Sequence, residues 1–429
     1  MKKHGTKLTV AEPQIASSTP ASTGQITLPR LARNTRMLLR EFMLSAGMEA
    51  FLKEMEDDRT ALCGPKNEFQ ADRRAYRHGH DVGTLVLGGR KVRMPKPRVR
   101  SVGGQELELP HWRHFTEEDP LDERVQEQIL VGVSTRKYAR SLEGVPVGLE
   151  QTGVRRSSVS RRFVARTTRI VEEFLGRSLE ALDLPVMMLD GVHLGDHVLV
   201  VALGIDVTGK KHVLGVREGT TESEEVGKSL LRDLIDRGVR VERARLFVID
   251  GGKGLRKAIR AVFGHWALVQ RCQVHKVRNV IEHLPEHQRV WARAALRRAW
   301  SAATVERARD LLRTLAGRLH GEHPGAANSI EEGLDETLTL IRLGIVGALH
   351  QTLHSTNPIE NLQGSIRRVT GRVKRWRGGF MALRWTASAL LEAEKSFRRV
   401  KGHREIPQLV AALDATLGEK VVDKEVQIA

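Results

Sequence analysis

Two aspartates in this sequence lie where metal-assisted chemistry could take place. Asp190 ends the apolar run PVMMLD and Asp250 ends the run ARLFVID, and each is followed directly by glycine. Charged side chains rarely lie inside a buried strand without a partner, whereas at the carboxyl end of a strand they face the crevice where ligands bind. The glycines let the backbone turn there and let a bulky substrate approach. The two positions are therefore candidates for one site.

Glu360 is the candidate for a third carboxylate. Two carboxylates at neighbouring strand ends, with a third on a helix, make an oxygen-only site that suits Mg²⁺ or Mn²⁺. Two such ions about 3.5–4 Å apart can activate a water or hydroxyl and stabilise the leaving oxygen of a phosphodiester. An aspartate after a strand is also a common turn residue, and we expect Asp196 and Asp206 to be of that kind. The residues alone leave both interpretations open for Asp190 and Asp250.

Glu360 is the only acidic residue in HSTNPIENLQGSIRRVTGRVKRWRGG, residues 354–379. One interpretation is a capped or ion-paired helix with a solvated basic face. The other is a metal-binding carboxylate beside cationic side chains that bind a polyanion. Trp376 could stack on an unpaired base or pack in the core, whereas we expect Trp385 to be a core residue. The basic residues that follow Glu360 are Arg367, Arg368, Arg372, Lys374, Arg375 and Arg377.

The composition favours a nucleic-acid partner. The 429 residues carry a formal net charge of +18, and a polyanion relieves the self-repulsion of that charge. A basic membrane-surface protein would show a polybasic anchor or a lipidation motif, but neither is visible, and there is no apolar run of 18 residues. Two cysteines, Cys63 and Cys272, cannot form a disulfide framework, which favours a reducing cytosol. The length predicts two or three domains.

The amino-terminal half is expected to be mostly helical with one hairpin. Residues 1–28 read as a disordered polar leader, and residues 31–55 have helical apolar spacing. The segment GTLVLGGRKVRMPKPRV predicts a β-hairpin.

Residues 122–170 predict three helices, of which the second opens at Ser134, in a helix-turn-helix-like module. The alternative is a three-helix cap with a solvated basic face. The arginines of the third helix, as candidate DNA contacts, are Arg155, Arg156, Arg161, Arg162, Arg166 and Arg169.

The central block changes to an α/β pattern. Three apolar strand-like runs begin at PVMMLD, and they are followed by a helix, the strand ARLFVID and another helix, which predicts a mixed α/β layer. Residues 280–350 have helical spacing throughout, and a further long helix is expected over 380–400.

Cys272 and His275 have the spacing of metal ligands, with His283 and His287 downstream. A zinc site would need all four side chains to converge, and the downstream histidines read instead as solvated residues at a helix end. We therefore expect Cys272 to be packed rather than ligating. Lys253, in DGGKG, could contact a DNA phosphate or be solvated, since the P-loop spacing is absent.

The order of these motifs resembles the mutator-type transposases of bacterial insertion sequences, which are relatives of the eukaryotic Mutator elements. The resemblance runs over residues 60–405, from YRHGHDVGTLVL through GVSTRKYARSLEG, LDG, VIDGGKG, CQVHKVRN and HSTNPIEN to MALRWTASALLEAEKSFRRVKG. Family members often read Thr-Asn-Ala-Ile-Glu-Ser where this chain has Pro358 and Asn361. Proline is tolerated in a first helical turn.

The resemblance implies a DNA transposase with a ribonuclease-H-like α/β domain and an Asp-Asp-Glu triad of Asp190, Asp250 and Glu360, which is expected to bind two Mg²⁺ or Mn²⁺ ions. Cys272 and His275 match a family signature near that site. The 110 residues from Asp250 to Glu360 are long for this fold, and a helical insertion would account for them.

The implied partners are terminal inverted repeats, target DNA and a second copy of the chain, in the bacterial cytoplasm at the nucleoid. A metal-dependent nuclease and a catalytically inactive DNA-binding relative are the alternatives. The expected segments are a leader (1–28), a helix and hairpin region (29–121), a DNA-binding domain (122–180), a catalytic core (181–279), a helical insertion (280–350), the carboxyl-terminal core helices (351–405) and a tail (406–429).

Overall fold

The computed structural model describes residues 35–68, 72–117, 119–143, 150–219, 221 and 223–416. The chain divides into two compact units, the first made of residues 1–118 and 142–152 and the second of residues 119–141 and 153–429. The expected leader over 1–28 and the last residues of the expected tail lie outside the described residues. No helix among the described residues is both long enough and apolar enough to cross a membrane.

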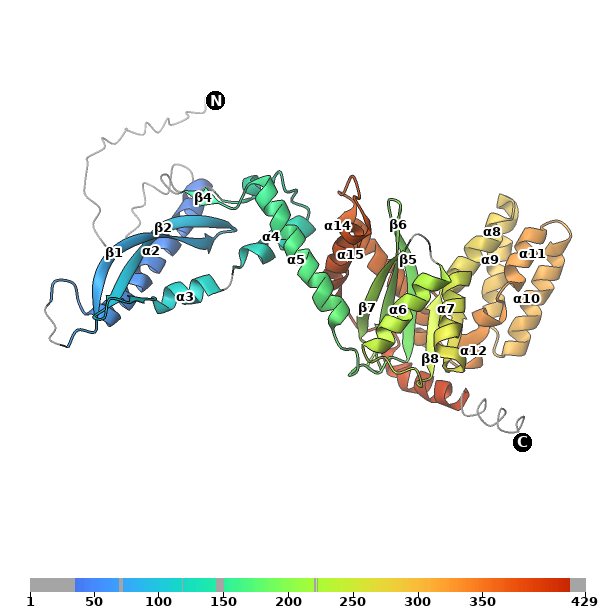
Figure 1. Cartoon of the computed structure of the whole chain (residues 1–429). Coiled ribbons are helices and arrows are strands. Elements are labelled where there is room, and N and C mark those ends of the chain that lie inside the picture. Colours follow the sequence, from blue (N-terminus) through green and yellow to red (C-terminus); the bar gives the residue numbers. More distant parts are fainter. Residues whose placement is uncertain are drawn as a thin grey trace, which may run out of the picture. The chain divides into compact units, whose positions relative to one another are not determined.

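The first unit packs one long helix against a hairpin (Figure 1). The expected turn at Gly88 and Gly89 is present, and both glycines have positive φ angles of 56° and 77°, as a tight two-residue hairpin turn requires. Apolar side chains such as Met55, Met94 and Trp112 fill the space between helix and sheet. The elements are α2 (Thr35–Cys63), β1 (Ala75–Leu87), β2 (Arg90–Ser101), β3 (Glu106–Leu107), α3 (Pro110–Glu117) and β4 (Gln151–Thr152).

The second unit begins with two helices, α4 (Leu121–Leu130) and α5 (Arg156–Gly176). The prediction of a second helix that begins at Ser134 is wrong. Only a single 3-10 turn, Tyr138–Ser141, forms in its place. Tyr138 is the one buried side chain of that turn, and so little apolar surface cannot hold a short helix in water.

A five-stranded sheet follows, in the order β7-β6-β5-β8-β9. The pairs β5–β6 and β6–β7 are antiparallel, whereas β5–β8 and β8–β9 are parallel. The mixed α/β prediction is therefore confirmed. The strands are β5 (Val186–Leu194), β6 (His197–Ile205), β7 (Lys211–Gly219), β8 (Arg245–Ile249) and β9 (Ala267–Arg271).

Two details of the sheet differ from the sequence-based expectation. Asp190 does not end its strand, because β5 continues to Leu194 in a hairpin with β6, and only the pairing with β8 stops before Asp190. The strand β9 was not predicted, since its short sequence ALVQR ends in two polar residues. Both of these, Gln270 and Arg271, are buried in the structure and hydrogen-bonded to backbone carbonyls.

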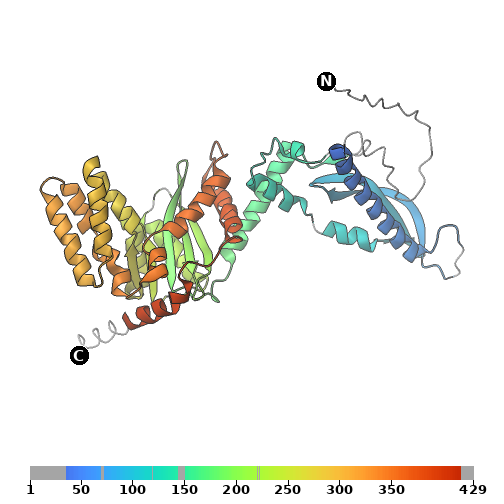
Figure 2. The ribbon, with the colours of Figure 1, turned by 180° about the vertical axis from the view of Figure 1, so that it is seen from behind.

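Side chains alternate along β5 and β8 and so build two cores on opposite faces of the sheet. Met187 and Phe247 face α6 (Glu224–Asp236) and α7 (Lys253–Phe263). Met188 and Val248 face α14 (Asn357–Thr370) and α15 (Gly379–Glu394). Figure 1 shows α6 and α7 in front of the sheet, and Figure 2 shows the later helices covering its back.

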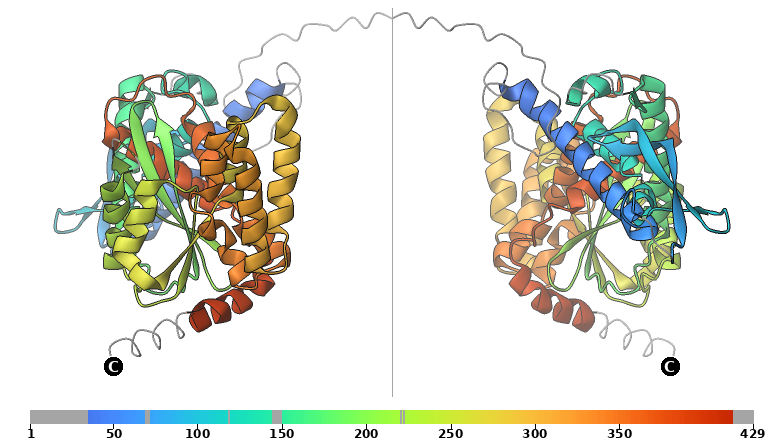
Figure 3. Two further views of the ribbon diagram at one scale, coloured as in Figure 1. Left: turned by 90° about the vertical axis from the view of Figure 1, so that its right-hand side faces the viewer. Right: turned by 90° about the vertical axis from the view of Figure 1, so that its left-hand side faces the viewer.

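The segment between β9 and α14 is helical, as predicted for residues 280–350. The helices are α8 (Gln273–Glu282), α9 (Glu286–Trp300), α10 (Val305–His320), α11 (Pro324–Glu331), α12 (Thr339–Arg342) and α13 (Gly347–Leu353). Helices α8–α11 share a separate apolar core that includes Leu296 and Leu312, whereas Leu349 and Leu353 of α13 pack into the core of the sheet. Figure 3 shows the helices side by side next to the sheet.

Candidate active site and nucleic-acid surface

Asp190 and Asp250 follow the paired residues of two adjacent strands, β5 and β8. Val186, Met187 and Met188 of β5 pair with the residues 60 positions later in β8, and the pairing ends two residues before Asp190 and Asp250, which have the same offset. Because side chains alternate along a strand, Asp190 shares the face of Met188, which α14 covers, whereas Asp250 directly follows the end of β8. The backbone N–H of the following glycine donates to Asp190 Oδ1 at 2.9 Å.

The first turn of α14 carries Glu360 to that same face. The helix buries Ile359 and Leu362 against the sheet, so their neighbour Glu360 lies at the rim of the core. One turn later, Gln363 Nε2 donates to the carbonyl of Gly191 at 3.0 Å, which fixes α14 next to the residue after Asp190. Pro358 lies in the first turn and does not disturb the helix.

Thr356 links Glu360 to Cys272 and His275. Its hydroxyl donates to Glu360 Oε1 at 2.6 Å and lies 3.4 Å from Cys272 Sγ and 3.3 Å from His275 Nδ1. The hydroxyl has one proton, and the short contact to a carboxylate is the stronger hydrogen bond. His275 Nδ1 is 3.8 Å from Glu360 Oε1. The backbone N–H of Gln273 donates to the carbonyl of His354 at 2.9 Å and thereby joins the two segments.

Ionisation of the nearby groups reflects this clustering. The hydrogen bond with Cys272 raises the pKa of the His275 imidazole, burial acts against it, and the negative charges of Glu360 and Asp250 raise it further. Burial opposes ionisation of the Cys272 thiol, but hydrogen bonds from His275 and Thr356 outweigh it and lower the pKa of the thiol. Asp250 and Glu360 therefore both lie close enough to His275 for their charges to act on it.

The donor atoms at this site permit two kinds of metal binding. Cys272 Sγ, His275 Nδ1 and a Glu360 oxygen lie within 4.8 Å of one another, which would suit a soft metal. The Thr356 hydroxyl, however, already contacts all three groups, and the thiol is fully buried. The carboxylates of Asp190, Asp250 and Glu360 are the oxygen donors that Mg²⁺ and Mn²⁺ prefer, so their chemistry fits such an ion, although among the described residues the group with ligand atoms within 4.8 Å joins Glu360 to Cys272 and His275.

A cationic cavity of about 590 Å³ lies elsewhere in the second unit. Arg156, at the start of α5, lines it together with the basic segment that follows α14. Phe163 and Trp385, whose rings are 4.8 Å apart, supply apolar lining. The four basic residues of that segment that line the cavity are Arg372, Lys374, Arg375 and Arg377, all of them exposed.

Not all predicted DNA contacts have free side chains. Arg162 forms an ion pair with Asp122 and another with Asp119 at 3.1 Å, and Arg169 contacts Asp122 at 3.0 Å. Arg166 bonds to Gln126 at 3.2 Å. This face of α5 is therefore engaged by residues in and beside α4.

The remaining candidates on α5 and α14 point outward. Arg155 and Arg161 are exposed on α5, and Arg367 and Arg368 are exposed in the last turn of α14. Arg367 lies 3.3 Å from Gln363 Oε1, one turn earlier in the helix.

The other side chains considered from the sequence do not join the candidate site. Lys253 is exposed and lies 3.8 Å from Glu332. Trp376 is partly buried and packs against the core of the sheet. His283 and His287 are exposed and do not join Cys272 in a metal-ligand group among the described residues.

Asp196 lies in the turn between β5 and β6, and Asp206 closes the turn before β7 by accepting from the backbone N–H of Thr208 and Lys210. Thr356 and Gln363 were not among the residues predicted for the site. Their positions four residues before and three residues after Glu360 on a helix were the available signal.

Comparison with known proteins identifies the family. The family model described as "Transposase, Mutator family" matches residues 24–399. The chain is 30% identical to the transposase for insertion sequence element ISRM5 of Rhizobium meliloti, over 84% of this chain and 88% of that protein. It is 27% identical to the transposase for IS256 in transposon Tn4001 of Staphylococcus aureus, over 74% and 81%.

The match to the transposase for IS1081 of Mycobacterium tuberculosis is 26% identical and spans 94% of this chain and 96% of that protein. A family match over most of the chain and relatives covered nearly end to end point to the same conclusion. The chain belongs to the Mutator family of transposases.

Proposed function

We propose that this transposase cuts DNA at the terminal inverted repeats of an insertion sequence and joins the freed 3′ end to target DNA, with Asp190, Asp250 and Glu360 as its catalytic triad. The observation that carries the proposal is the parallel pairing of β5 with β8, which ends two residues before each aspartate, with α14 and Glu360 on a face of the same sheet. Three carboxylates in a chain with a formal net charge of +18 suit metal-assisted chemistry on a polyanion.

Each residue has a defined task in this proposal. Asp190, held within β5, and Asp250, directly after β8, form the rigid side of the site. Glu360 completes it from α14, where Thr356 fixes one of its oxygens and Gln363 fixes the helix against the strand. Two divalent ions held by these carboxylates would supply the activation of the attacking hydroxyl and the stabilisation of the leaving oxygen.

The topology supports a ribonuclease-H-like core. Three antiparallel strands are followed by two parallel strands on the other side of β5, with helices on both faces. The helices α8–α13 would then be an insertion between β9 and α14. Helix α5 and the cavity beside it would bind the repeat DNA, and pairing of two transposon ends would require a dimer of the chain.

The proposal is tested with the purified chain, Mg²⁺ or Mn²⁺, and a labelled duplex that ends in the element's own terminal repeat. We expect cleavage at the repeat end and joining to a second duplex. Asp190→Asn, Asp250→Asn and Glu360→Gln should each abolish both reactions while binding persists. Asp206→Asn, at a turn aspartate, is the matched control and should cleave normally.

Three other results would contradict parts of the proposal. Cleavage without joining would indicate a nuclease. Binding without any metal-dependent cleavage would indicate an inactive DNA-binding relative. Cleavage that survives Glu360→Gln would mean that the third carboxylate lies elsewhere.

A further inference from the structure

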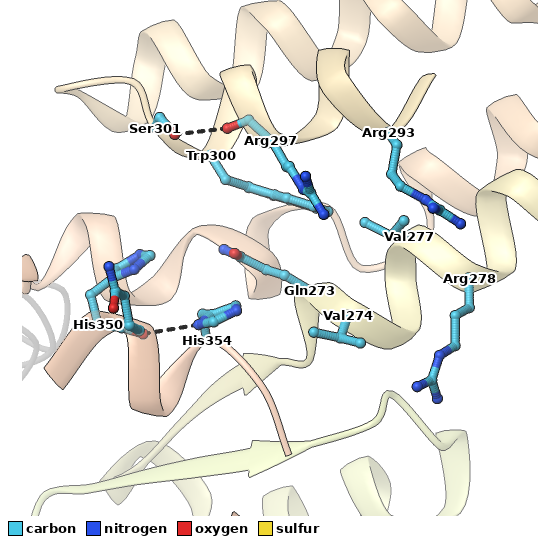
Figure 4. Close-up of a pocket in the computed structure, with 11 residues that line it drawn as sticks. Gln273, Val274, Val277, Arg278, Arg293, Arg297, Trp300, Ser301, His350 and His354 are labelled. Carbon is cyan, nitrogen blue, oxygen red and sulfur yellow. Dashed lines mark hydrogen bonds between the residues drawn. The ribbon is translucent and has the colours of Figure 1, made fainter. Parts of the chain in front are cut away.

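A second cavity, of about 630 Å³, lies between α8, α9 and α13, apart from the cationic cavity beside α5 (Figure 4). Arg278 reaches it from α8, and Arg293 and Arg297 reach it from α9. All three are exposed, and none of them forms an ion pair in the part of the chain that the structure describes. Three uncompensated guanidinium groups around one cavity favour an anion there.

The cavity also has the apolar and hydrogen-bonding surfaces that a flat heterocycle needs. Trp300 is nearly buried, and its indole N–H donates to Thr337 at 3.1 Å, so the ring is held firmly. His350 and His354 stack with ring centroids 5.9 Å apart and planes 8° apart. Gln273 lines the same space and offers an amide (Figure 4). Burial, with the charge of His354, lowers the pKa of His350, so the anion-binding charge comes from the arginines.

The cavity adjoins the proposed active site. Gln273 directly follows Cys272, and His354 lies two residues before Thr356, whose hydroxyl bonds to Glu360. The hydrogen bond from Gln273 N–H to the His354 carbonyl forms part of the wall between the two. The cavity and the proposed site are therefore neighbours that share the start of α8 and the segment before α14.

We propose that this cavity binds one unpaired nucleotide of the DNA strand next to the bond being cleaved, with its phosphate at the arginines and its base against Trp300 and the two histidines. The proposal rests on the proposed function, because it takes the ligand to be the DNA substrate. A base stacked inside a duplex cannot enter such a cavity, whereas an unstacked base presents both faces and its hydrogen-bonding edge. The volume is within the usual range of small-ligand sites.

The test is photo-crosslinking of the full chain, in EDTA, to a single-stranded 15-mer of thymidine with one 5-iodouracil. Mapping of the crosslinked peptides should find Trp300, His350 or His354. The same label in the middle of a blunt duplex should crosslink there at least about tenfold less, since its base stays stacked. Crosslinks confined to other segments, or equal yields from the duplex, would overturn the proposal.

Charge-matched variants separate this cavity from the general attraction of a basic protein for DNA. R278A/R293A/R297A should lower the cavity crosslink at least tenfold. It should also reduce the slope of log K against log salt by roughly 0.7, the value for one phosphate of a single strand, because one nucleotide occupies the cavity. The control R298A/R307A/R313A removes three exposed arginines from the same helical region and should change neither value. Equal losses in both variants would refute a specific site.

The failures of the two proposals can be told apart. If the wild type cleaves repeat DNA and Glu360→Gln does not, but no crosslink reaches the cavity, the nucleotide site is wrong and the triad stands. If the cavity crosslinks form as expected while Asp190→Asn still cleaves, the nucleotide site stands and the triad is wrong.

Discussion

Thr356→Val removes the hydroxyl that bonds to Glu360 while keeping the shape of the side chain. Hydrogen bonds to charged groups contribute about 1.5–3 kcal/mol. Because 28% of the Glu360 side chain is exposed, water replaces part of the lost bond, and the lower figure of about 1.5 kcal/mol is the better choice. If the Thr356 hydroxyl positions the Glu360 carboxylate for the reaction, the cleavage rate of Thr356→Val should be about tenfold lower than that of the wild type.

Single-turnover cleavage of the repeat duplex at several Mn²⁺ concentrations measures this effect. Thr356→Val should need more Mn²⁺ for half-maximal rate, and Thr356→Ser, which keeps the hydroxyl, should restore the wild-type curve. Thr370→Val is the matched control, because Thr370 is buried on the same helix but its hydroxyl bonds only to the carbonyl of Ile366. A Thr356→Val variant with wild-type rate and metal dependence would refute the positioning role.

Three further predictions concern the backbone, the DNA surface and a buried charge. Gly251→Ala should destabilise the fold by at least about 1 kcal/mol in urea unfolding, because φ is +110° and a Cβ would overlap the guanidinium of Arg271. The control Gly364→Ala lies in a helix with no atom near the new Cβ, and it should stabilise the fold by up to about 1 kcal/mol. In filter-binding titrations, R375A/R377A should reduce the salt slope for duplex DNA by nearly 2, at about 0.9 per lost phosphate contact; an unchanged slope would exclude these contacts. Burial lowers the pKa of Lys276 to about 8, below its unfolded value of 10.5, so the unfolded chain binds more protons between these two pH values. The stability of the wild type should therefore rise with pH in this window, by up to about 1.4 kcal/mol per pH unit relative to Lys276→Met. Equal pH dependence of the two proteins in urea unfolding would contradict this.

Local patterns in the sequence predicted much of the fold. The glycine pair between two strand-like runs predicted the hairpin of the first unit, and the apolar runs predicted the strands from β5 to β8. These features depend on turn chemistry and hydrophobic periodicity, which neighbouring residues determine. Strand β9 escaped prediction because its burial depends on partners that are distant in sequence, such as the Thr337 carbonyl, which accepts from Gln270.

In the candidate site, too, the residue types could be predicted from the sequence, but the contacts between residues far apart in the chain could not. The residue types and the family resemblance singled out Asp190, Asp250 and Glu360, but not the pairing of β5 with β8 that ends two residues before each aspartate. The contact of Thr356 with Cys272 joins residues 84 positions apart, and no local pattern reports it. The helix predicted from Ser134 failed for the opposite reason, because good local helix residues had too little apolar surface to bury.

Iron-directed cleavage of the protein backbone tests most directly whether Asp190, Asp250 and Glu360 share metal ions. Fe²⁺ replaces Mg²⁺ at an oxygen-donor site and, with ascorbate and peroxide, produces hydroxyl radicals that cut the chain close to the ion. We predict fragments ending near residues 190, 250 and 360, suppressed by excess Mg²⁺ and lost in Asp250→Asn. Cuts that cluster around His283 and His287 instead, or that persist unchanged in that variant, would contradict the triad.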